Sequence, residues 1–535
     1  MKKGLKCILG VIGALVAVFI LEYILLIPVN LKFFPTAVVA VAVASIFLGI
    51  LGYCFNRKKE SKKAISGFFI MTLLPILIFV VYTVGNSPII RPTTFRGMIG
   101  EVEEEDFKVE ISPIDINNLP TVDEDLADNL GDKELGTKVA LGSQVTLGEF
   151  TKQNVDGELY WVAPLLHSGF FKWINNREGT PGYVMVSAVN SKNVKLVDNI
   201  NGEPIKIKYQ PNAYFNSYLK RHIFMNGNFN ECLTDFSFEL DDNGKPYWVV
   251  TKYTNSIGFD GEKVLGVILV DAQSGEINEY GMDEIPEWID RVVPMEFAKE
   301  RIDWWGELIH GFFNFSKKDM LTTTEGMNLV YNDGKCYYYT GVTSVGADES
   351  IVGFVLTDTR TGEAVFNKVS GSTETAAMQS AEGKVQQMGY TATLPILINV
   401  ENIPTYFMTL KDRKGLVKQY AMVSVEDYSI VATGESIAET KSNYVKNLKS
   451  KGDIKLDYTG QSKELKGTVE RIGGFQIEGN TFYNFTVKEA KGKVFTVSSF
   501  ISKELPVTKE GDRVSFTYNE TSESIDLLEF DNEDV

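Results

Sequence analysis

The stretch VLGVILVDAQSGEI at residues 264–277 has a counterpart in IVGFVLTDTRTGEA at residues 351–364, with Asp271 and Asp358 in register. Each copy is a run of apolar, mostly β-branched residues that ends in a polar S/T-G-E turn. Such runs favour strands, and glycine among small polar residues favours a tight turn. A strand and turn that recur within one chain predict a repeated β unit.

An aromatic strand precedes each copy. DDNGKPYWVV at 241–250 corresponds to YNDGKCYYYT at 331–340, and VDGELYWVAP at 155–164 has the same form. The Asn-Gly and Asp-Gly pairs in these stretches are hairpin signals. With more distant copies at 183–194 and 405–434, the sequence predicts four related antiparallel β units.

Two stretches with helical periodicity lie between these units. Glu374 to Met388 is expected to form one helix, and a second is expected to begin at Pro294. The first offers Ala376, Ala377, Ala381 and Val385 for one face, and the second offers Met295, Ala298, Ile302, Trp305, Ile309 and Phe312. Apolar residues three and four apart form one face of a helix. We expect the second helix to pack on the β units rather than on a bilayer, because its acidic residues oppose anionic lipid.

The order of helix, strand, loop, strand and G-E turn resembles PepSY-like modules, most visibly at 374–434 and less fully at 241–280 and 331–366. These modules are small α+β domains of bacterial secreted and membrane-anchored proteins. The resemblance implies a binding or inhibitory role, often in peptidase control or at the cell envelope, and it carries over no catalytic residues. The chain departs from the pattern in having no recognisable peptidase domain, which puts the inhibitory role in doubt.

Three apolar stretches begin the chain, from Cys7 to Pro28, from Thr36 to Phe55 and from Ile65 to Gly85. Each is long enough for a hydrocarbon core of about 30 Å, so three transmembrane helices are expected. A cleaved signal peptide is the rival interpretation of residues 1–28. It is disfavoured because the apolar run is longer than roughly 7–15 residues and no A-x-A-like site follows.

Basic residues set the predicted orientation of these spans. They lie at the amino terminus and in the loop between the second and third apolar stretches: Lys2, Lys3, Lys6, Arg57, Lys58, Lys59, Lys62 and Lys63. Lys and Arg in short loops near spans are retained on the cytoplasmic side. The amino terminus is therefore expected in the cytoplasm, and everything after Gly85 outside it.

The charge is divided unevenly along the chain. Residues 1–85 carry nine Lys or Arg and two acidic residues, a net charge of +7, whereas the whole chain has −17, so the remainder carries −24. Phosphate backbones repel such a surface, and nucleic acid is excluded as an expected partner. Cationic partners, or solubility alone, fit this charge better.

Cys232 and Cys336 are the cysteines that lie outside the apolar stretches and their borders. In an oxidising compartment they could form one disulfide, although two cysteines do not make a disulfide framework. Two buried free thiols are the alternative.

A separate β module is expected near the carboxyl terminus. The strand-like segments GTVERIGGF, NTFYNFTV, KVFTVSSFI and DRVSFTYN alternate apolar and polar residues between glycine-containing turns. Their spacing resembles an OB-fold-like or SH3-like barrel. OB-folds bind oligonucleotides or oligosaccharides, and Phe482, Tyr483, Phe485 and Phe495 could form such a platform, although filling the core is the favoured role.

Motifs for catalysis, cofactors and metals are missing. His167, His222 and His310 lie in no triad-like or metal-ligand motif, and the usual zinc, hydrolase, redox and phosphate motifs are not found. Ser217 to Lys220 matches S-x-x-K without its partner motifs. Glu239 to Gly244 imitates half of an EF-hand loop, but the closing Glu position holds Val250, so a hairpin turn is expected. No catalytic, cofactor or metal residue is therefore assigned.

The predicted fold class is a three-span α-helical membrane anchor, an α+β ectodomain of repeated antiparallel β units with helices, and a small all-β barrel. The expected parts are the spans at 1–85, an acidic stalk at 86–141 with one short helix at Val122 to Leu130, a first pair of β units at 142–284, a helical connector at 285–320, a second pair at 321–440, a linker at 441–465 and the barrel at 466–535.

These features predict a non-enzymatic multi-pass membrane protein that presents extracytoplasmic binding or scaffold modules at a bacterial cell envelope. Its expected partners are the lipid bilayer and an envelope protein or cell-wall component. Two alternatives stay open. One is a regulator of an envelope peptidase or cell-wall hydrolase, and the other is a cell-wall-modifying enzyme that uses carboxylates of the acidic surface.

Overall fold

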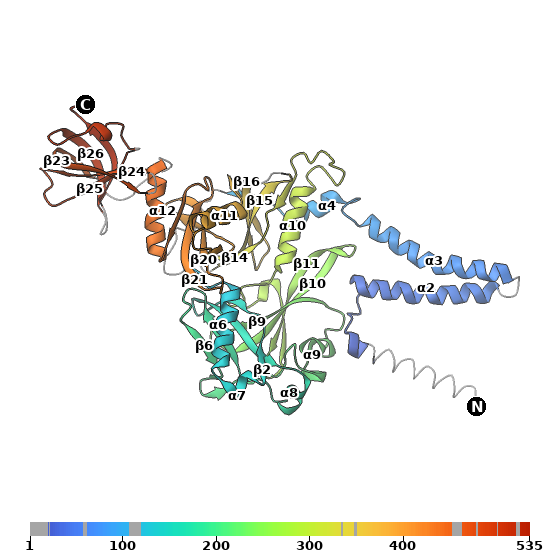
Figure 1. Cartoon of the computed structure of the whole chain (residues 1–535). Helices are drawn as coiled ribbons and strands as arrows, with labels where there is room; N and C mark the ends of the chain where they lie inside the picture. The colour runs from blue at the N-terminus through green and yellow to red at the C-terminus, as the bar shows by residue number, and fades with distance from the viewer. Residues whose placement is uncertain are drawn as a thin grey trace. The chain divides into compact units, whose positions relative to one another are not determined.

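The computed structural model of this chain describes residues 20, 22–56, 61–105, 119–332, 335–346, 350–451, 463–477, 480–499, 501–520 and 525–535. The chain divides into two units, Met1–Thr375 and Ala376–Val535. Helix and strand labels follow Figure 1.

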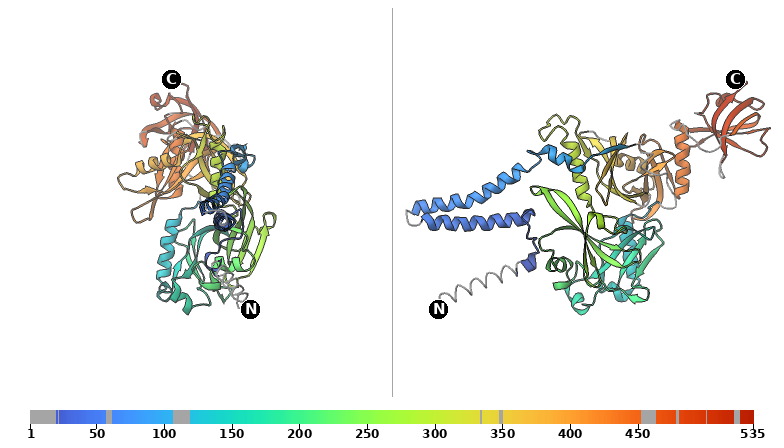
Figure 2. Two further views of the ribbon diagram at one scale, coloured as in Figure 1. Left: turned by 90° about the vertical axis from the view of Figure 1, so that its right-hand side faces the viewer. Right: turned by 180° about the vertical axis from the view of Figure 1, so that it is seen from behind.

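Two long apolar helices, α2 (Phe34–Asn56) and α3 (Ser61–Gly85), form an antiparallel hairpin in the first unit (Figures 1 and 2). Both are long and apolar enough to cross a membrane, with a mean hydropathy of 2.4 over each span. Glycine permits their close approach, since a Cβ atom at Gly52 would lie 2.5 Å from the carbonyl oxygen of Gly67. Most of the first predicted span, Cys7 to Pro28, lies outside the described residues.

Four antiparallel sheets share one plan, in which consecutive strands pair with their neighbours. The first sheet contains β3 (Thr151–Val155), β4 (Glu158–His167), β5 (Tyr183–Ser187) and β6 (Val194–Val197), and the second contains β9 (Cys232–Leu240), β10 (Pro246–Ile257), β11 (Asp260–Asp271) and β12 (Ile277–Gly281). The third sheet contains β14 (Asn328–Asn332), β15 (Lys335–Ser344), β16 (Ser350–Asp358) and β17 (Ala364–Ser372). The fourth sheet contains β19 (Ile396–Val400), β20 (Ile403–Lys411), β21 (Val417–Ser424) and β22 (Val431–Gly434). Short strands extend three of them: β2 (Val145–Leu147) pairs with β4, β13 (Leu321–Thr323) with β15, and β18 (Thr391–Ala392) with β20.

The two aligned sequence copies occupy corresponding places in the second and third sheets. Each runs along the third strand of its sheet and through the turn that follows. The Oδ1 atom of Asp271 accepts hydrogen bonds from the backbone N–H groups of Gln273 and Ser274 at 2.8 and 3.0 Å. Asp358 makes the same pair of bonds with the two residues that follow Thr359, at 2.8 and 2.9 Å. The repeated Asp is therefore an Asx-turn residue in both copies.

Helices precede the sheets along the chain: α6 (Glu124–Gly136), α9 (Leu219–Met225), α10 (Met295–Glu307) and α11 (Glu374–Lys384). The expected face of α11 is buried, as are Ala298 and Ile302 of α10. Trp305 of α10 packs against Phe366 of β17, with ring centroids 5.6 Å apart. This helix therefore packs on a β unit, as its acidic face predicts, but it ends before Ile309 and Phe312.

The expected acidic stalk is packed against the first unit where it is described. Strand β1 (Glu103–Glu105) pairs in parallel with β17, and α4 (Pro92–Arg96) buries Phe95 against Trp304 at 4.8 Å. Helix α6 is longer than the expected Val122 to Leu130, and Asp123 caps it by accepting a bond from the N–H of Leu126 at 3.0 Å. The acid-rich composition suggested a stalk, but a few apolar residues are enough to pack this segment.

The expected linker at 441–465 begins within a helix. Helix α12 (Ile437–Lys451) packs on β21 and β22. Its buried residues Thr440, Tyr444 and Leu448 recur every four positions, and the Tyr444 hydroxyl lies 3.0 Å from Oγ1 of Thr405. The Lys, Asn and Ser residues occupy the other positions of the helix. Residues 452–462 lie outside the described ranges.

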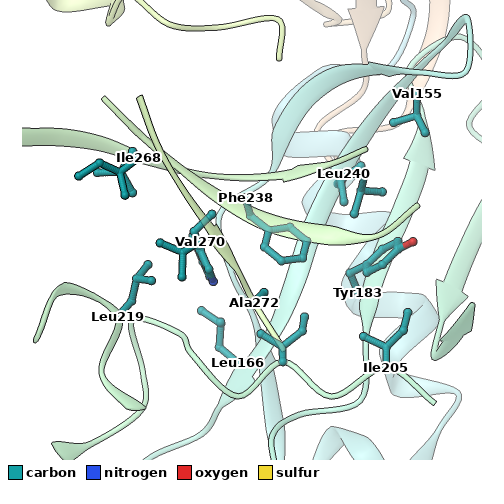
Figure 3. Packing of buried hydrophobic residues seen from close by; sticks show 14 of the residues in the cluster. Val155, Leu166, Tyr183, Ile205, Leu219, Phe238, Leu240, Ile268, Val270 and Ala272 are labelled. Carbon is teal, nitrogen blue, oxygen red and sulfur yellow. The ribbon is translucent and has the colours of Figure 1, made fainter. Parts of the chain in front are cut away.

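A core of sixteen buried apolar residues in the first unit lies between the first two sheets. Figure 3 shows its side chains pointing toward one another, with Tyr183 from β5 facing Phe238 and Leu240 from β9. The ring centroids of Tyr183 and Phe238 are 6.0 Å apart. The Tyr183 hydroxyl donates to the carbonyl of Gly244 at 2.7 Å, so its polar atom is satisfied at the edge of the core.

The last five strands close into a barrel in the order β23-β24-β25-β27-β26. They are β23 (Lys463–Ile477), β24 (Asn480–Val487), β25 (Phe495–Ser498), β26 (Arg513–Glu520) and β27 (Ile525–Asn532). Phe482, Phe485 and Phe495 are buried, and Phe485 packs edge-on against Phe516 at 5.2 Å. Of the four aromatic residues proposed as a platform, Tyr483 is partly exposed.

Leu448→Ala tests whether residues 441–451 pack as a helix rather than act as a linker. We expect the substitution to lower the free energy of unfolding by about 2–5 kcal/mol, because it removes a buried side chain and leaves a cavity. Urea unfolding of the full chain in detergent measures this. The exposed Lys446→Ala on the same helix should change the value by less than about 0.5 kcal/mol. Equal, small effects of both changes would show that α12 is not packed.

Candidate functional site

The three histidines lie on separate elements. His167 is buried on β4, Nε2 of His222 in α9 lies 2.7 Å from the carbonyl oxygen of Gly275, and Nε2 of His310 lies 2.8 Å from Oδ2 of Asp319. Within the described ranges, no group of three or more His, Cys, Asp and Glu side chains is placed to hold a metal ion. The histidines are therefore not brought together into one site.

The two weak motifs adopt ordinary turn and helix positions. Ser217 ends the 3-10 turn η3 (Phe215–Ser217), and Lys220 is exposed in the first turn of α9. Oδ1 of Asp241 accepts hydrogen bonds from the N–H groups of Asn243 and Lys245, both at 2.9 Å. This is the hairpin turn that the sequence predicts for the EF-hand-like stretch.

Cys232 and Cys336 are both free and buried. Cys232 lies on β9 of the second sheet and Cys336 on β15 of the third, so the disulfide considered from the sequence is absent. Burial raises the pKa of the Cys232 thiol to about 11 and that of Cys336 to about 12. High thiol pKa values make both poor nucleophiles.

A connector formed by residues 285–294 joins the second sheet to α10 and is bonded to the turn after β16. The N–H groups of Val292 and Val293 donate to the carbonyl of Thr359 at 3.0 and 2.8 Å. The guanidinium of Arg360 donates to the carbonyls of Pro286 and Ile285 at 2.9 and 3.1 Å. One face of the connector is thus held by the third sheet.

The same connector also bonds to the first two sheets. Oδ2 of Asp290 accepts from the N–H of Asn154 on β3 at 2.8 Å. The carbonyl of Val292 accepts from Oγ1 of Thr251 on β10 at 2.9 Å. Three sheets of the first unit therefore meet around this one stretch of chain.

Ionisable side chains gather at this meeting point. Arg291 is partly buried, and the charges of Asp235 and Glu239 keep its pKa raised although burial alone would lower it. Burial raises the pKa of Glu239 to about 7, against the opposing effect of Arg291. Oε1 of Glu239 accepts from Oγ of Ser237 at 2.7 Å, whereas Oε2 has no hydrogen-bond partner among the described residues. Nε of Arg291 is likewise buried without a hydrogen-bond partner among the described residues.

Lys152 on β3 is another buried ionisable group of this region. Its Nζ atom lies 3.4 Å from the carbonyl oxygen of Leu329 and within 6 Å of the ring centroids of Trp161 and Tyr331. The Tyr331 hydroxyl donates back to the Lys152 carbonyl at 3.0 Å. Burial lowers the pKa of the Lys152 ammonium to about 8. These bonds join the first sheet to the third.

Two groups of ionisable residues are suited to fixing the sheets against one another. One is the cluster of Asp235, Glu239, Asp290 and Arg291, and the other is Lys152 with its contacts on β14. A general base or nucleophile must reach the reacting atom of its substrate. Glu239 instead bonds to Ser237 of its own strand, and Lys152 contacts Leu329 and Tyr331 of β14. Both side chains are buried. Removing one member of such a cluster leaves a buried charge without compensation, which is costly. The sequence offered no signal for the cluster, because its members are far apart along the chain.

A second candidate region lies where the sheets of the first unit meet the apolar helices α2 and α3. The ring of Phe259, at the tip of the β10–β11 hairpin, lies 5.5, 5.4 and 5.4 Å from those of Phe34, Phe79 and Tyr82. Nδ2 of Asn255 donates to the carbonyl of Lys32 at 2.9 Å. The start of α2 and the end of α3 therefore contact the same hairpin.

The predicted topology residues fall partly within the described chain. Lys62 and Lys63 lie in the first turn of α3, at the end of the helix away from Phe259. Arg57, Lys58 and Lys59, with Lys2, Lys3 and Lys6, lie outside the described residues. The 23 residues of α2 span about 35 Å, which is about the distance along the helix pair between Phe259 and the end that holds Lys62 and Lys63.

Comparisons with known proteins assign no family. No family model matches the chain, and no curated protein matches it. Among solved structures, a GH32 β-fructofuranosidase from Bombyx mori is 10% identical over 76% of this chain and 70% of its own, with a TM-score of 0.16. An exo-1,5-α-L-arabinanase from a bovine ruminal metagenomic library is 9% identical over 71% and 98%, with a TM-score of 0.15. Likenesses this weak carry no argument about fold or function.

Glu239→Gln tests the buried cluster through the pH dependence of stability. Because the folded-state pKa of about 7 lies above the usual value of 4.5, the folded chain holds this proton more tightly than the unfolded chain. The stabilisation is complete below about pH 4.5 and is lost as the pH rises through 7. Gln does not titrate, so the variant should gain up to about 3 kcal/mol relative to wild type between pH 5 and pH 8.

Urea unfolding of the full chain in detergent at pH 5, 6, 7 and 8 measures this difference. Glu276→Gln, at an exposed position on the turn before β12, is the matched control and should show the same difference from wild type at every pH. A pH-independent difference for Glu239→Gln would contradict the raised pKa.

Proposed function

We propose that the chain is a non-enzymatic, three-span membrane protein that presents extracytoplasmic binding or scaffold modules at the cell envelope. The observation that carries this proposal is the contact of Phe259 with both α2 and α3. It joins the sheets of the first unit to one end of an apolar helix pair. The basic residues Lys62 and Lys63 lie at the other end.

The positive-inside rule then gives the orientation. With the loop at 57–63 in the cytoplasm, the end of the helix pair at Phe259 is extracytoplasmic, and so are the sheets attached to it. A further span at Cys7 to Pro28 places the amino terminus and Lys2, Lys3 and Lys6 in the cytoplasm as well. This arrangement puts the part of the chain with charge −24 outside.

The modules themselves fit a binding role. In each repeat, one helix precedes an antiparallel sheet of four main strands. This order supports the PepSY-like interpretation of the repeats. The closed five-stranded barrel, in which β25 and β27 are parallel, supports an OB-fold-like rather than an SH3-like module. An envelope protein or cell-wall component is the proposed partner, and nucleic acid is not, because the acidic surface repels phosphates.

Labelling of single cysteines on intact cells tests the orientation. In a background with Cys7 and Cys54 replaced by Ser, Lys133→Cys, at an exposed position of α6, should react with a membrane-impermeant maleimide on intact cells. Ser61→Cys, next to the basic loop, should react only after the cells are permeabilised. The buried Cys232 and Cys336 contribute little labelling. The reverse pattern would overturn the proposed localisation.

A further inference from the structure

Two segments of the first unit are basic in an otherwise acidic ectodomain. Residues 166–177 and 205–230 contain six Lys or Arg and no Asp or Glu. The basic residues are Lys172, Arg177, Lys206, Lys208, Lys220 and Arg221. Glu178, Glu203 and Glu231 border the two segments, so it is the segments themselves, within a region of net charge −24, that are suited to an anionic partner.

The same two segments expose aromatic side chains that pack on one another. In α8 (Phe170–Asn175), Phe170 lies 5.1 Å from the ring of Tyr214, and Trp173, which is buried, lies 5.7 Å from that of Phe215. Phe171 is 77% exposed and Phe215 is 58% exposed. A group of exposed aromatic rings next to basic residues is typical of the membrane interface, where rings enter the headgroup region. We call the surface of residues 166–177 and 205–230 the aromatic-basic face.

Contacts with the membrane-proximal chain place this face beside the helices. Nε of Arg221 donates to the carbonyl of Tyr23 at 2.9 Å, and its guanidinium lies 4.3 Å from the Tyr23 ring centroid. The N–H of Val29 donates to the carbonyl of Phe229 at 2.8 Å. Tyr23 and Val29 lie in the stretch that leads into α2. The aromatic-basic face is therefore continuous with the end of the apolar helices that also contacts Phe259.

A loop after α10 has the same composition and adjoins the other membrane helix. Phe313 and Phe315 are 62% and 87% exposed, and Lys317 and Lys318 follow them. A Cβ atom at Gly311 would lie 3.8 Å from Pro92, which begins α4 shortly after α3 ends. The nearby Asp319 is paired with His310 at 2.8 Å. Aromatic and basic side chains are thus present beside both connections to the helix pair.

We propose that the aromatic-basic face and the loop at Phe313 rest on the anionic headgroups of the bilayer that α2 and α3 cross. This inference relies on the proposed membrane insertion of these helices. The aromatic rings enter the interface, while Lys and Arg lie near lipid phosphates and hold the first unit against the membrane. The other surfaces of the first unit then face envelope partners at a fixed distance from the bilayer surface.

Spin labels on the full chain test this proposal. Single cysteines at Phe171, Phe313, Leu77 and Asn243 are introduced with Cys7 and Cys54 replaced by Ser, and the protein is reconstituted into nanodiscs with or without phosphatidylglycerol. Asn243 is the control, since it is exposed at the end of β10 opposite to Phe259, about 40 Å away by strand length. Accessibility of each label to oxygen and to a water-soluble nickel chelate gives its depth.

The labels at Phe171→Cys and Phe313→Cys should be at least about twofold less accessible to the nickel chelate than that at Asn243→Cys, most strongly with phosphatidylglycerol. Adding Lys172→Glu and Lys220→Glu should reduce this protection at residue 171 and leave residue 77 unchanged. A label at Leu77 that is accessible to the chelate would contradict membrane insertion itself.

Two results would overturn the inference while membrane insertion holds. In the first, the label at residue 77 has the oxygen and chelate accessibilities of the hydrocarbon core, but the labels at residues 171, 313 and 243 are equally accessible to the chelate. The other is spin–spin broadening at residue 171 that increases with the number of chains per disc, because it would mean that a second copy, rather than lipid, covers this face.

Discussion

The first unit depends on the connector at residues 285–294, where three antiparallel sheets meet. The second sheet buries apolar residues on both faces, Val250 and Ile268 on one and Val249 and Leu269 on the other, but hydrophobic packing alone does not set the relative position of three sheets. Directional bonds do this: Asp290 accepts from β3, the carbonyl of Val292 accepts from Thr251 of β10, and Val292 and Val293 donate to Thr359 beyond β16. The ionisable groups around Arg291 add a requirement for exact fit, because a misplaced buried charge is costly.

The bonds at the connector also affect how the sheets meet the apolar helices. The β10–β11 hairpin begins in the core of the first unit and ends at Phe259 between the two apolar helices. Because this long hairpin is packed in the sheets at one end and contacts the helices at the other, it fixes the position of the helix pair relative to the sheets. The separation of charge between the basic segments near Tyr23 and the acidic remainder of the ectodomain is consistent with a surface that faces lipid. The contacts of Phe259 and those of Arg221 with Tyr23 thus join the first unit to the same end of the helix pair.

Local features were predictable where neighbouring residues decide them. The aligned Asp271 and Asp358 form the same turn, and the faces of α10 and α11 follow their apolar spacing. Predictions from composition were less accurate: the acid-rich segment before residue 141 and the Lys-rich segment after 441 both contain packed helices. A few apolar residues at helical spacing, such as Tyr444 and Leu448, outweigh the polar majority because only one face of a helix needs to be buried.

By itself, the sequence determined the apolar helices, the strand and turn repeats and the division of charge, because each depends on residues close together in the chain. Only the tertiary structure decided which ionisable groups are buried. Glu239 and Lys152 have ordinary neighbours in sequence, and their shifted pKa values come from strands and connectors that are distant along the chain. The same holds for Cys232 and Cys336, whose separation on two different sheets leaves both thiols free. Burial and long-range contact are properties of the assembled sheets, and no local pattern encodes them.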